Sequence, residues 1–165
     1  AYEHFTAKPD IISFGKKAQV CGVLANKEKF DEIPNNVFKE SSRINSTFGG
    51  NFIDILRFQL IMEVIEKENL VENARIVGEY LVEGLQILAQ KYPEKLSNPR
   101  GRGLMAAIDL PNGDQRDKMR ELLYDEGVII LSCGDQSIRF RPHLNVSKEE
   151  IQIALDKIEL CIEKL

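Results

Sequence analysis

The sequence predicts an α/β protein, and three observations support that prediction. Residues 1–51 contain short apolar runs separated by turn residues, which is typical of strands and loops. Residues 52–96 have the apolar spacing of helices. Residues 97–165 alternate in the order β-α-β-β-α, which predicts a small sheet with helices on one face. We therefore expect three parts with these bounds.

The first part contains two apolar runs, residues 10–15 and residues 20–25, on either side of a Lys-Lys pair. Turn residues follow at 34–36. Short strands of this kind are not stable alone, so we expect a larger sheet to complete them.

Two helices are predicted in the second part. Residues 52–65 are apolar nearly all round, which predicts a helix buried on more than one side. After a break at residues 68–69, apolar residues recur every three or four positions from Leu70 and predict a helix that ends near Pro93.

The third part begins with a strand over residues 103–110, closed by a Pro-Asn-Gly turn. Asp114 is the expected cap of the next helix, and Gly127 the expected stop.

Two strands, over residues 128–131 and 137–140, are expected to follow that helix. Ser147 and Glu150 have the spacing of a capping box, which predicts the start of the last helix.

Composition excludes several classes of protein. The chain has 165 residues, of which 43% are hydrophobic, and this is compatible with one packed core. With 22 basic and 26 acidic residues the net charge is −4, so no nucleic-acid partner is expected. No apolar stretch is long enough for a membrane span, and no secretory signal pattern is present, so we expect no membrane partner and a cytoplasmic location.

The cysteines and histidines predict no metal site. Cys21, Cys133 and Cys161 are odd in number and widely spaced, which argues against disulfides and against zinc, so all three are expected to be reduced. His4 and His143 are too far apart in sequence to indicate a metal site or a histidine-assisted nucleophile.

Lys16 is the candidate catalytic residue. It follows an apolar strand-like run and Gly15, where an amine is fixed and partly desolvated. Such a setting suits a lysine that captures a carbonyl group. The alternative is a solvated pair with Lys17, which strand alternation would direct to the opposite side.

Two further positions are candidates for binding anions. Thr47 is followed closely by two glycines, so its hydroxyl and nearby amides can approach a phosphate; the alternative is a turn that caps the following helix, with Ser46 as a possible cap. Arg139 and Arg141 alternate with apolar residues and share one side of a strand. A guanidinium matches a carboxylate with two hydrogen bonds, although paired arginines are often only surface charge.

Three stretches together resemble a known family. They are residues 9–22 (PDIISFGKKAQVCG), 42–51 (SRINSTFGGN) and 138–142 (IRFRP). In this order they resemble signature segments of class III aminotransferases, which use pyridoxal phosphate. Residues 99–105 (PRGRGLM) add similarity to the lysine-specific branch, the L-lysine 6-aminotransferases.

The resemblance implies a role for each candidate residue. Lys16 would form the Schiff base with the cofactor, and Thr47 would bind the cofactor phosphate across a homodimer interface. Arg139 would hold the substrate α-carboxylate, and Asn45 would contact the substrate. The implied fold is the C-terminal part of a fold type I pyridoxal-phosphate-dependent transferase: the end of the large-domain sheet, bridging helices and the small C-terminal α/β domain.

The chain also departs from the family pattern. The phosphate loop, the aromatic residue that stacks on the cofactor ring and the aspartate at the ring nitrogen do not precede Lys16. The resemblance therefore implies a fragment that is inactive alone.

Transfer of the side-chain amine of L-lysine to 2-oxoglutarate is the expected function. The alternatives are another ω-aminotransferase, acting on ornithine, acetylornithine or 4-aminobutyrate, and a non-catalytic α/β binding module.

Overall fold

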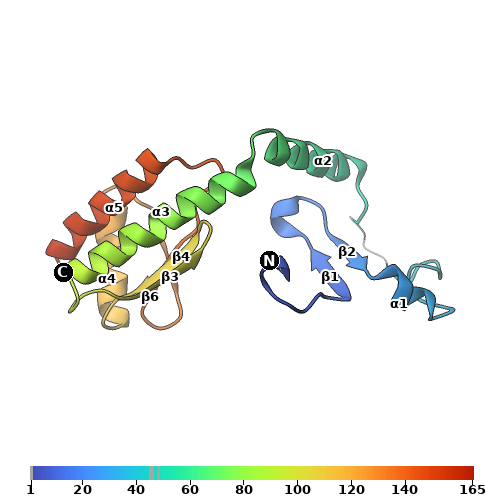
Figure 1. Cartoon of the computed structure of the whole chain (residues 1–165), viewed down its shortest axis with the longest axis horizontal. Helices are drawn as coiled ribbons and strands as arrows, with labels where there is room; N and C mark the ends of the chain where they lie inside the picture. The colour runs from blue at the N-terminus through green and yellow to red at the C-terminus, as the bar shows by residue number, and fades with distance from the viewer. Residues whose placement is uncertain (1, 45–46, 48) are drawn as a thin grey trace. The chain divides into compact units, whose positions relative to one another are not determined.

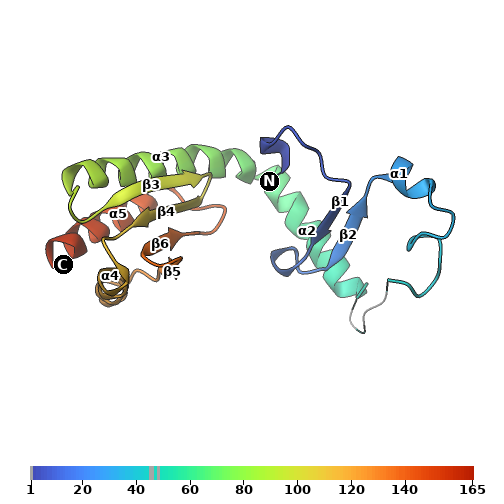
Figure 2. The same cartoon turned by 90° about the horizontal axis from the view of Figure 1, so that it is seen from below.

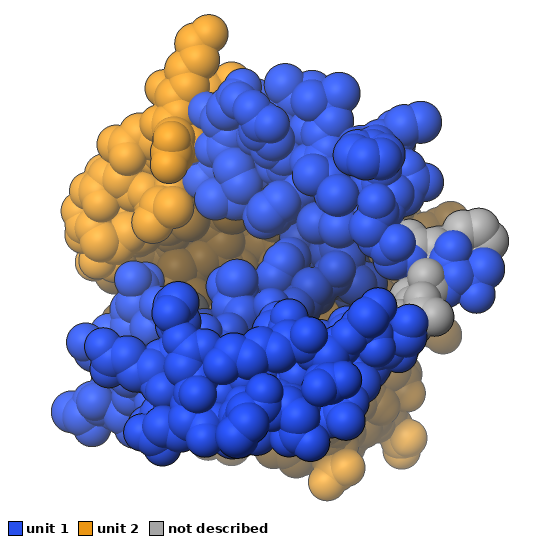
Figure 3. Space-filling model, turned by 90° about the vertical axis from the view of Figure 1, so that its right-hand side faces the viewer, with its two compact units in different colours: residues 1–65 blue, residues 66–165 orange. Residues whose placement is uncertain are grey.

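The computed structural model describes residues 2–44, 47 and 49–165. These residues form two compact units, residues 1–65 and 66–165, which are coloured separately in Figure 3. Each unit is described here by itself. The sequence-based division at residues 51 and 96 stays a prediction.

A two-stranded antiparallel sheet organises the first unit (Figure 1). Strand β1 (Ile11–Phe14) pairs with β2 (Gly22–Ala25), and Phe14 lies opposite Gly22. A 3-10 turn, η2 (Lys16–Ala18), connects the two strands. The two predicted apolar runs are thus strands of one hairpin.

Two short helical elements of this unit are not predicted by the sequence pattern. They are the 3-10 turn η1 (Tyr2–His4) and the helix α1 (Lys27–Asp31). The side chain of Asn26 caps α1 by accepting hydrogen bonds from the amides of Glu28 and Lys29. Five residues are too few to give a helical apolar pattern, so only the cap is visible in the sequence.

Helix α2 (Phe52–Lys67) confirms the first predicted helix. It begins after Asn51, whose Oδ1 accepts the amide of Ile53 at 2.9 Å. The predicted burial is wrong for the described chain: none of the α2 residues is buried, and Phe52 is 88% exposed. The apolar pattern predicted the helix correctly, but among the described residues its side chains are at most partly covered, as where Phe58 stacks on Phe14 of β1.

The second unit is a four-stranded antiparallel sheet in the order β3-β4-β6-β5, packed against helices (Figure 2). Its elements are α3 (Leu70–Lys91), β3 (Ser97–Arg102), β4 (Met105–Asp109), α4 (Gly113–Asp125), β5 (Leu131–Cys133), β6 (Ser137–Phe140) and α5 (Lys148–Glu163).

One continuous apolar core joins the sheet to its helices. The side chains of Ile108 and Ile138 face the core from the two central strands and are fully buried. Leu81 of α3, Met119 of α4 and Ile158 of α5 belong to the same cluster. All three helices therefore cover one face of the sheet, as predicted, and burial of their apolar side chains stabilises the unit.

Capping and stop residues in the sequence predicted most of the helix ends in this unit correctly. The predicted helix from Leu70 is α3. Gly127 has a left-handed φ of 81° just after α4, and Ser147 and Glu150 form the predicted capping box of α5. The predicted cap Asp114 is wrong, because the side chain of Asn112 accepts the amide of Gln115 at 2.9 Å.

Two strand predictions also differ from the structure. Strand β3 was not predicted, since it carries Pro99 and charged residues and forms only by pairing with β4. Strand β5 lies at Leu131–Cys133, later than the predicted residues 128–131, because its register follows its pairing with β6.

Across the described residues, no helix is both long and apolar enough to cross a membrane. The same residues contain no cluster of side chains able to hold a metal ion. Cys21, Cys133 and Cys161 form no disulfide among the described residues, and their reduced state stays a prediction.

Candidate active site

Lys16 lies in a strained turn. It is the first residue of η2, and its φ of 55° places the backbone in the left-handed region. Gln19, at the other end of η2, is also left-handed, with a φ of 63°. A non-glycine residue in this region costs about 1–3 kcal/mol and persists only where surrounding contacts hold it. Backbone outliers of this kind are concentrated at functional sites.

Hydrogen bonds and a close approach hold the turn. The amide of Gln19 donates to the carbonyl oxygen of Lys16 at 3.1 Å, and that of Ala18 donates to Gly15 at 3.3 Å. A Cβ atom on Gly15 would lie 2.9 Å from Cys21 Sγ. Glycine therefore allows the chain before Lys16 to pass close to the start of β2.

The environment of Lys16 differs in part from the sequence prediction. Its side chain was expected at a strand end and partly desolvated, but it is exposed in the described chain and lies in η2. The alternation argument against Lys17 is also wrong, because both lysines belong to a 3-10 turn and not to a strand. Among the described residues, no carboxylate forms an ion pair with Lys16.

Thr47 is exposed in a turn before α2. The sequence left open whether this stretch caps the helix; the structure gives that role to Asn51. The hydroxyl of Thr47 is therefore not needed as the cap. Gly50 nearby has a left-handed φ of 75° and open space at its Cβ position. Asn45 and Ser46, also named as candidates, lie outside the described residues.

Arg139 lies on the central strand β6, paired with Ala107 of β4 and Leu131 of β5. Its neighbours Ile138 and Phe140 are buried in the core, so Arg139 faces the opposite side of the sheet, as the alternation predicts. Its Nε is buried and has no hydrogen-bond partner within residues 66–165, all of which are described. A buried donor without a partner is uncommon and favours a ligand that accepts its hydrogen.

A polar network that the sequence analysis missed lies beside Arg139. Asp109 accepts hydrogen bonds from Asn98 at 2.9 Å, from Arg100 at 2.8 Å and from the hydroxyl of Ser137. Arg100 also donates to Ser137 at 3.0 Å. An irregularity in β3 between Ser97 and Arg100, with Asn98 at a φ of 51°, accompanies this arrangement.

The network distinguishes Arg100 from Arg139, which both lie on this side of the sheet. Asp109 lies opposite Ser137, one row along the strands from Arg139. Its carboxylate is paired with Arg100, whereas Arg139 has no carboxylate partner in this unit. Arg139 therefore keeps an uncompensated charge that a substrate carboxylate can neutralise. Arg141 follows the strand and is exposed.

The network also sets the charge state of Asp109. Burial alone would raise the pKa of its carboxyl group, but the hydrogen bonds from Ser137, Asn98 and Arg100 outweigh burial and hold the pKa below its ordinary value. Carboxylates that accept several hydrogen bonds remain ionised to low pH. Arg100 is thus neutralised throughout the physiological range.

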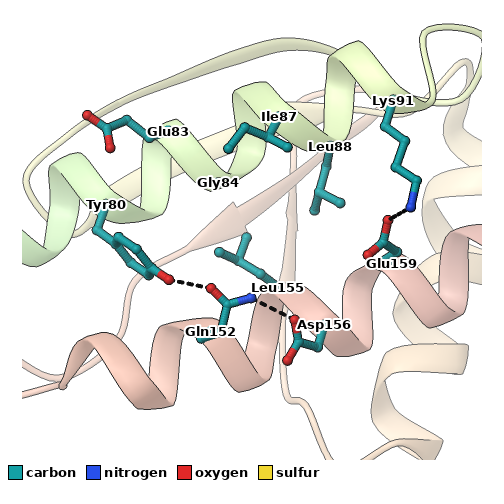
Figure 4. Close-up of a pocket in the computed structure, with 10 residues that line it drawn as sticks. All are labelled: Tyr80, Glu83, Gly84, Ile87, Leu88, Lys91, Gln152, Leu155, Asp156 and Glu159. Atoms are coloured by element: carbon teal, nitrogen blue, oxygen red, sulfur yellow. Dashed lines mark hydrogen bonds and ion pairs between the residues drawn. The ribbon is translucent and has the colours of Figure 1, made fainter.

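A separate cavity of about 290 Å³ lies between α3 and α5 (Figure 4). Tyr80 donates a hydrogen bond to Gln152, Gln152 donates to Asp156 at 2.6 Å, and Lys91 pairs with Glu159 at 2.6 Å. None of the predicted site residues lines it. The polar groups of this cavity mainly bond to one another. We therefore interpret the cavity as part of the packing interface between the two helices.

The sequence was then compared with known proteins. The model of the family "Aminotransferase class-III" matches residues 1–162, nearly the whole chain. The chain belongs to the class III aminotransferases. This membership confirms the resemblance drawn from the motifs.

The similar proteins agree with the family. An L-lysine-epsilon aminotransferase of Mycobacterium bovis is 47% identical over 98% of this chain and 36% of its own length. One of Streptomyces clavuligerus is 44% identical over 96% of this chain and 35% of its own length. A solved structure, lysine aminotransferase from M. tuberculosis in the internal aldimine form, matches with a TM-score of 0.94 and 44% identity, covering 99% of this chain and 37% of that one. This class III aminotransferase chain thus spans about a third of the length of these relatives.

The structural match confirms the predicted fold, part of a fold type I pyridoxal-phosphate-dependent transferase. Family membership and this relative also confirm pyridoxal phosphate as the cofactor of the class. Residues of the first unit fit that group: an exposed amine on a held turn, and an exposed threonine near a left-handed glycine.

Replacing Asp109 with asparagine is expected to destabilise the protein in a pH-dependent way. Because the folded pKa is lowered, the carboxylate stabilises the fold above its ordinary pKa, and this stabilisation is lost as pH falls through the folded value. Asp109→Asn should lower the free energy of unfolding by about 1–3 kcal/mol at neutral pH. Urea unfolding of the whole protein should show a constant deficit down to about pH 5 that narrows below about pH 4.

The exposed Asp135 in the same unit provides the control. Asp135→Asn should change the free energy of unfolding by less than about 0.5 kcal/mol. A deficit for Asp109→Asn that already disappears between neutral pH and about pH 5 would contradict the lowered pKa.

Proposed function

We propose that the protein containing this chain transfers the side-chain amino group of L-lysine to 2-oxoglutarate, with pyridoxal phosphate as cofactor. The observation that carries the proposal is the strained turn that presents Lys16, in a chain 44–47% identical to proteins named L-lysine-epsilon aminotransferases. Because the chain spans about a third of those relatives, the proposal concerns the whole protein.

Lys16 is proposed to do two things. Its Nζ would hold the cofactor through the aldehyde carbon, with the aldehyde oxygen leaving as water, and the same amine, once the substrate amine has replaced it, would move a proton at the substrate Cε. When bound, pyridoxal phosphate supplies the ring that accepts electrons from that carbon. Both roles require an amine free of a carboxylate partner, which is how Lys16 lies among the described residues.

Arg139 is proposed to bind the α-carboxylate of L-lysine and a carboxylate of 2-oxoglutarate. Its planar guanidinium offers two parallel hydrogen bonds, and the pairing of Arg100 with Asp109 leaves it without a competing carboxylate. Asn45 is proposed as a further substrate contact, on the resemblance alone.

Thr47 is proposed to bind the cofactor phosphate held by the other subunit of a homodimer. The support is its exposed hydroxyl, which the cap of α2 does not use, and its place in the resembling motif. A phosphate is doubly charged, so hydrogen bonds to it are about twice as strong as neutral ones.

Borohydride reduction of the cofactor-loaded protein tests the role of Lys16. It should fix the cofactor to Lys16, because the bond to Nζ becomes a stable amine, and peptide mapping by mass spectrometry should locate the adduct there. Lys17→Ala, the neighbouring control, should leave the adduct in place, and Lys16→Ala should abolish it. Finding the adduct on Lys17 would contradict the proposed role of Lys16.

Arg139→Ala tests carboxylate binding. Loss of a hydrogen bond to a charged group costs about 1.5–3 kcal/mol, so the KM for L-lysine should rise about 10- to 150-fold. The visible absorbance of the bound cofactor should not change. Arg102→Ala, which removes an exposed arginine of β3, is the matched control and should leave KM near its original value. An unchanged KM in Arg139→Ala would make this residue a surface charge.

Hybrid dimers test Thr47. If each site combines Lys16 of one subunit with Thr47 of the other, a dimer of a Lys16→Ala chain and a Thr47→Ala chain has one doubly defective site and one intact site. Mixing the two inactive variants should therefore restore up to about half of the activity per dimer. No recovery, with hybrids verified by native mass spectrometry, would place Thr47 in the site of its own subunit or outside any site.

A further inference from the structure

Both ends of the turn that carries Lys16 are strained. Lys16 and Gln19 are left-handed residues other than glycine, and the amide of Gln19 donates to the carbonyl oxygen of Lys16. The conformation of Gln19 therefore fixes the backbone of Lys16, and with it the direction in which the lysine side chain leaves the turn. Left-handed residues of this kind need contacts that hold them in place.

Helix α2 supplies such a contact to Gln19. Arg57 Nη1 donates to the side-chain oxygen of Gln19 at 3.3 Å. The same nitrogen donates to Asp54 Oδ1 at 3.1 Å, one helical turn earlier in α2. Asp54 thus orients the guanidinium, and the guanidinium holds the far end of the Lys16 turn.

The next residue of α2 contacts the strand that leads into the turn. Phe58 stacks on Phe14, the last residue of β1, with ring centroids 5.9 Å apart and planes inclined by 24°. The far end of the Phe14 ring in turn lies against Gly22 of β2, where a Cβ atom would be only 2.3 Å from the ring. Consecutive residues of α2 therefore contact the hairpin on the turn and on the strand that leads into it.

We infer that Gln19 and Arg57 are positioning residues for Lys16. They touch neither cofactor nor substrate in this scheme; they hold the left-handed turn in the conformation from which Lys16 Nζ reaches the cofactor. The inference rests on the proposed function, because it gives these residues a purpose through Lys16. The sequence motifs give neither residue a role of its own.

A double-mutant cycle on the whole protein tests the inference. The variants are Gln19→Ala, Arg57→Ala and the double variant. Each single change should raise the Kd for pyridoxal phosphate about 2- to 5-fold, the effect of losing one exposed charge-assisted hydrogen bond. The double variant should be no worse than either single variant, since both remove the same contact.

Hydrogen exchange supplies a readout that does not depend on activity. In the cofactor-free protein, the Gln19 amide should exchange about 2- to 5-fold faster in Arg57→Ala, because its bond to Lys16 opens more often. The pH midpoint of the visible absorbance of the loaded protein should shift equally in both single variants. Gln19→Glu keeps an acceptor for Arg57 and should restore the original Kd and exchange rate.

The control is Gln59→Ala. Gln59 lies on α2, and its one side-chain hydrogen bond among the described residues is to Glu63 of the same helix, so its loss should change neither the Kd nor the exchange rate. The inference would be overturned if the increases in Kd multiplied in the double variant. It would also be overturned if the exchange rate of the Gln19 amide did not change in Arg57→Ala.

The outcomes also separate this inference from the proposed function. If Lys16→Ala retains the visible band of the bound cofactor, the proposed function fails and the inference fails with it. If the band requires Lys16 but is insensitive to Gln19 and Arg57, only the inference fails.

Discussion

The close pairing of β1 and β2 is the constraint on which the candidate site depends. With Phe14 opposite Gly22, the chain must reverse direction within the residues between them. It does so through a 3-10 turn with left-handed residues at both ends, which fixes where Lys16 leaves the backbone. The pairing in turn requires Gly22, since any larger residue would displace the ring of Phe14. A glycine in β2 thus helps to determine the position of the candidate lysine.

The candidate carboxylate site depends on a different principle, the compensation of charge. Two arginines lie on the same side of the sheet in the second unit, and their surroundings make them different. Arg100 is neutralised by Asp109, which Asn98 and Ser137 also satisfy. Arg139 retains its charge and a buried Nε without a partner. Buried polar groups normally find partners, so Arg139 is the better candidate for binding an external carboxylate.

The sequence predicted what local patterns encode. The helix from Phe52, the capping box at Ser147 and the stop at Gly127 were all visible because each depends on neighbouring residues. Strand β3 was not visible, since SNPRGR has no apolar alternation and becomes a strand only beside β4.

The candidate site shows the same limit. The motifs pointed to Lys16 and Arg139, but the contact that holds the Lys16 turn and the network around Asp109 join residues far apart in the sequence. The apolar pattern of residues 52–65 correctly predicted helix α2. Its burial could not be predicted, because burial depends on which other segments pack against the helix.

The two units are stabilised in different ways, and this affects how the candidate residues respond to change. Arg139 stands on a strand whose other face is packed in a large apolar core. Among the described residues of the first unit, only Asn36 is buried, and hydrogen bonds and aromatic pairs hold the chain there. A core tolerates the loss of one surface contact, because many others remain. The turn of Lys16 has few contacts to share the strain, so each of them has a large effect on where the lysine points. The position of the Lys16 amine therefore depends on individual side chains of α2. The position of the Arg139 guanidinium depends instead on the packing of the whole second unit.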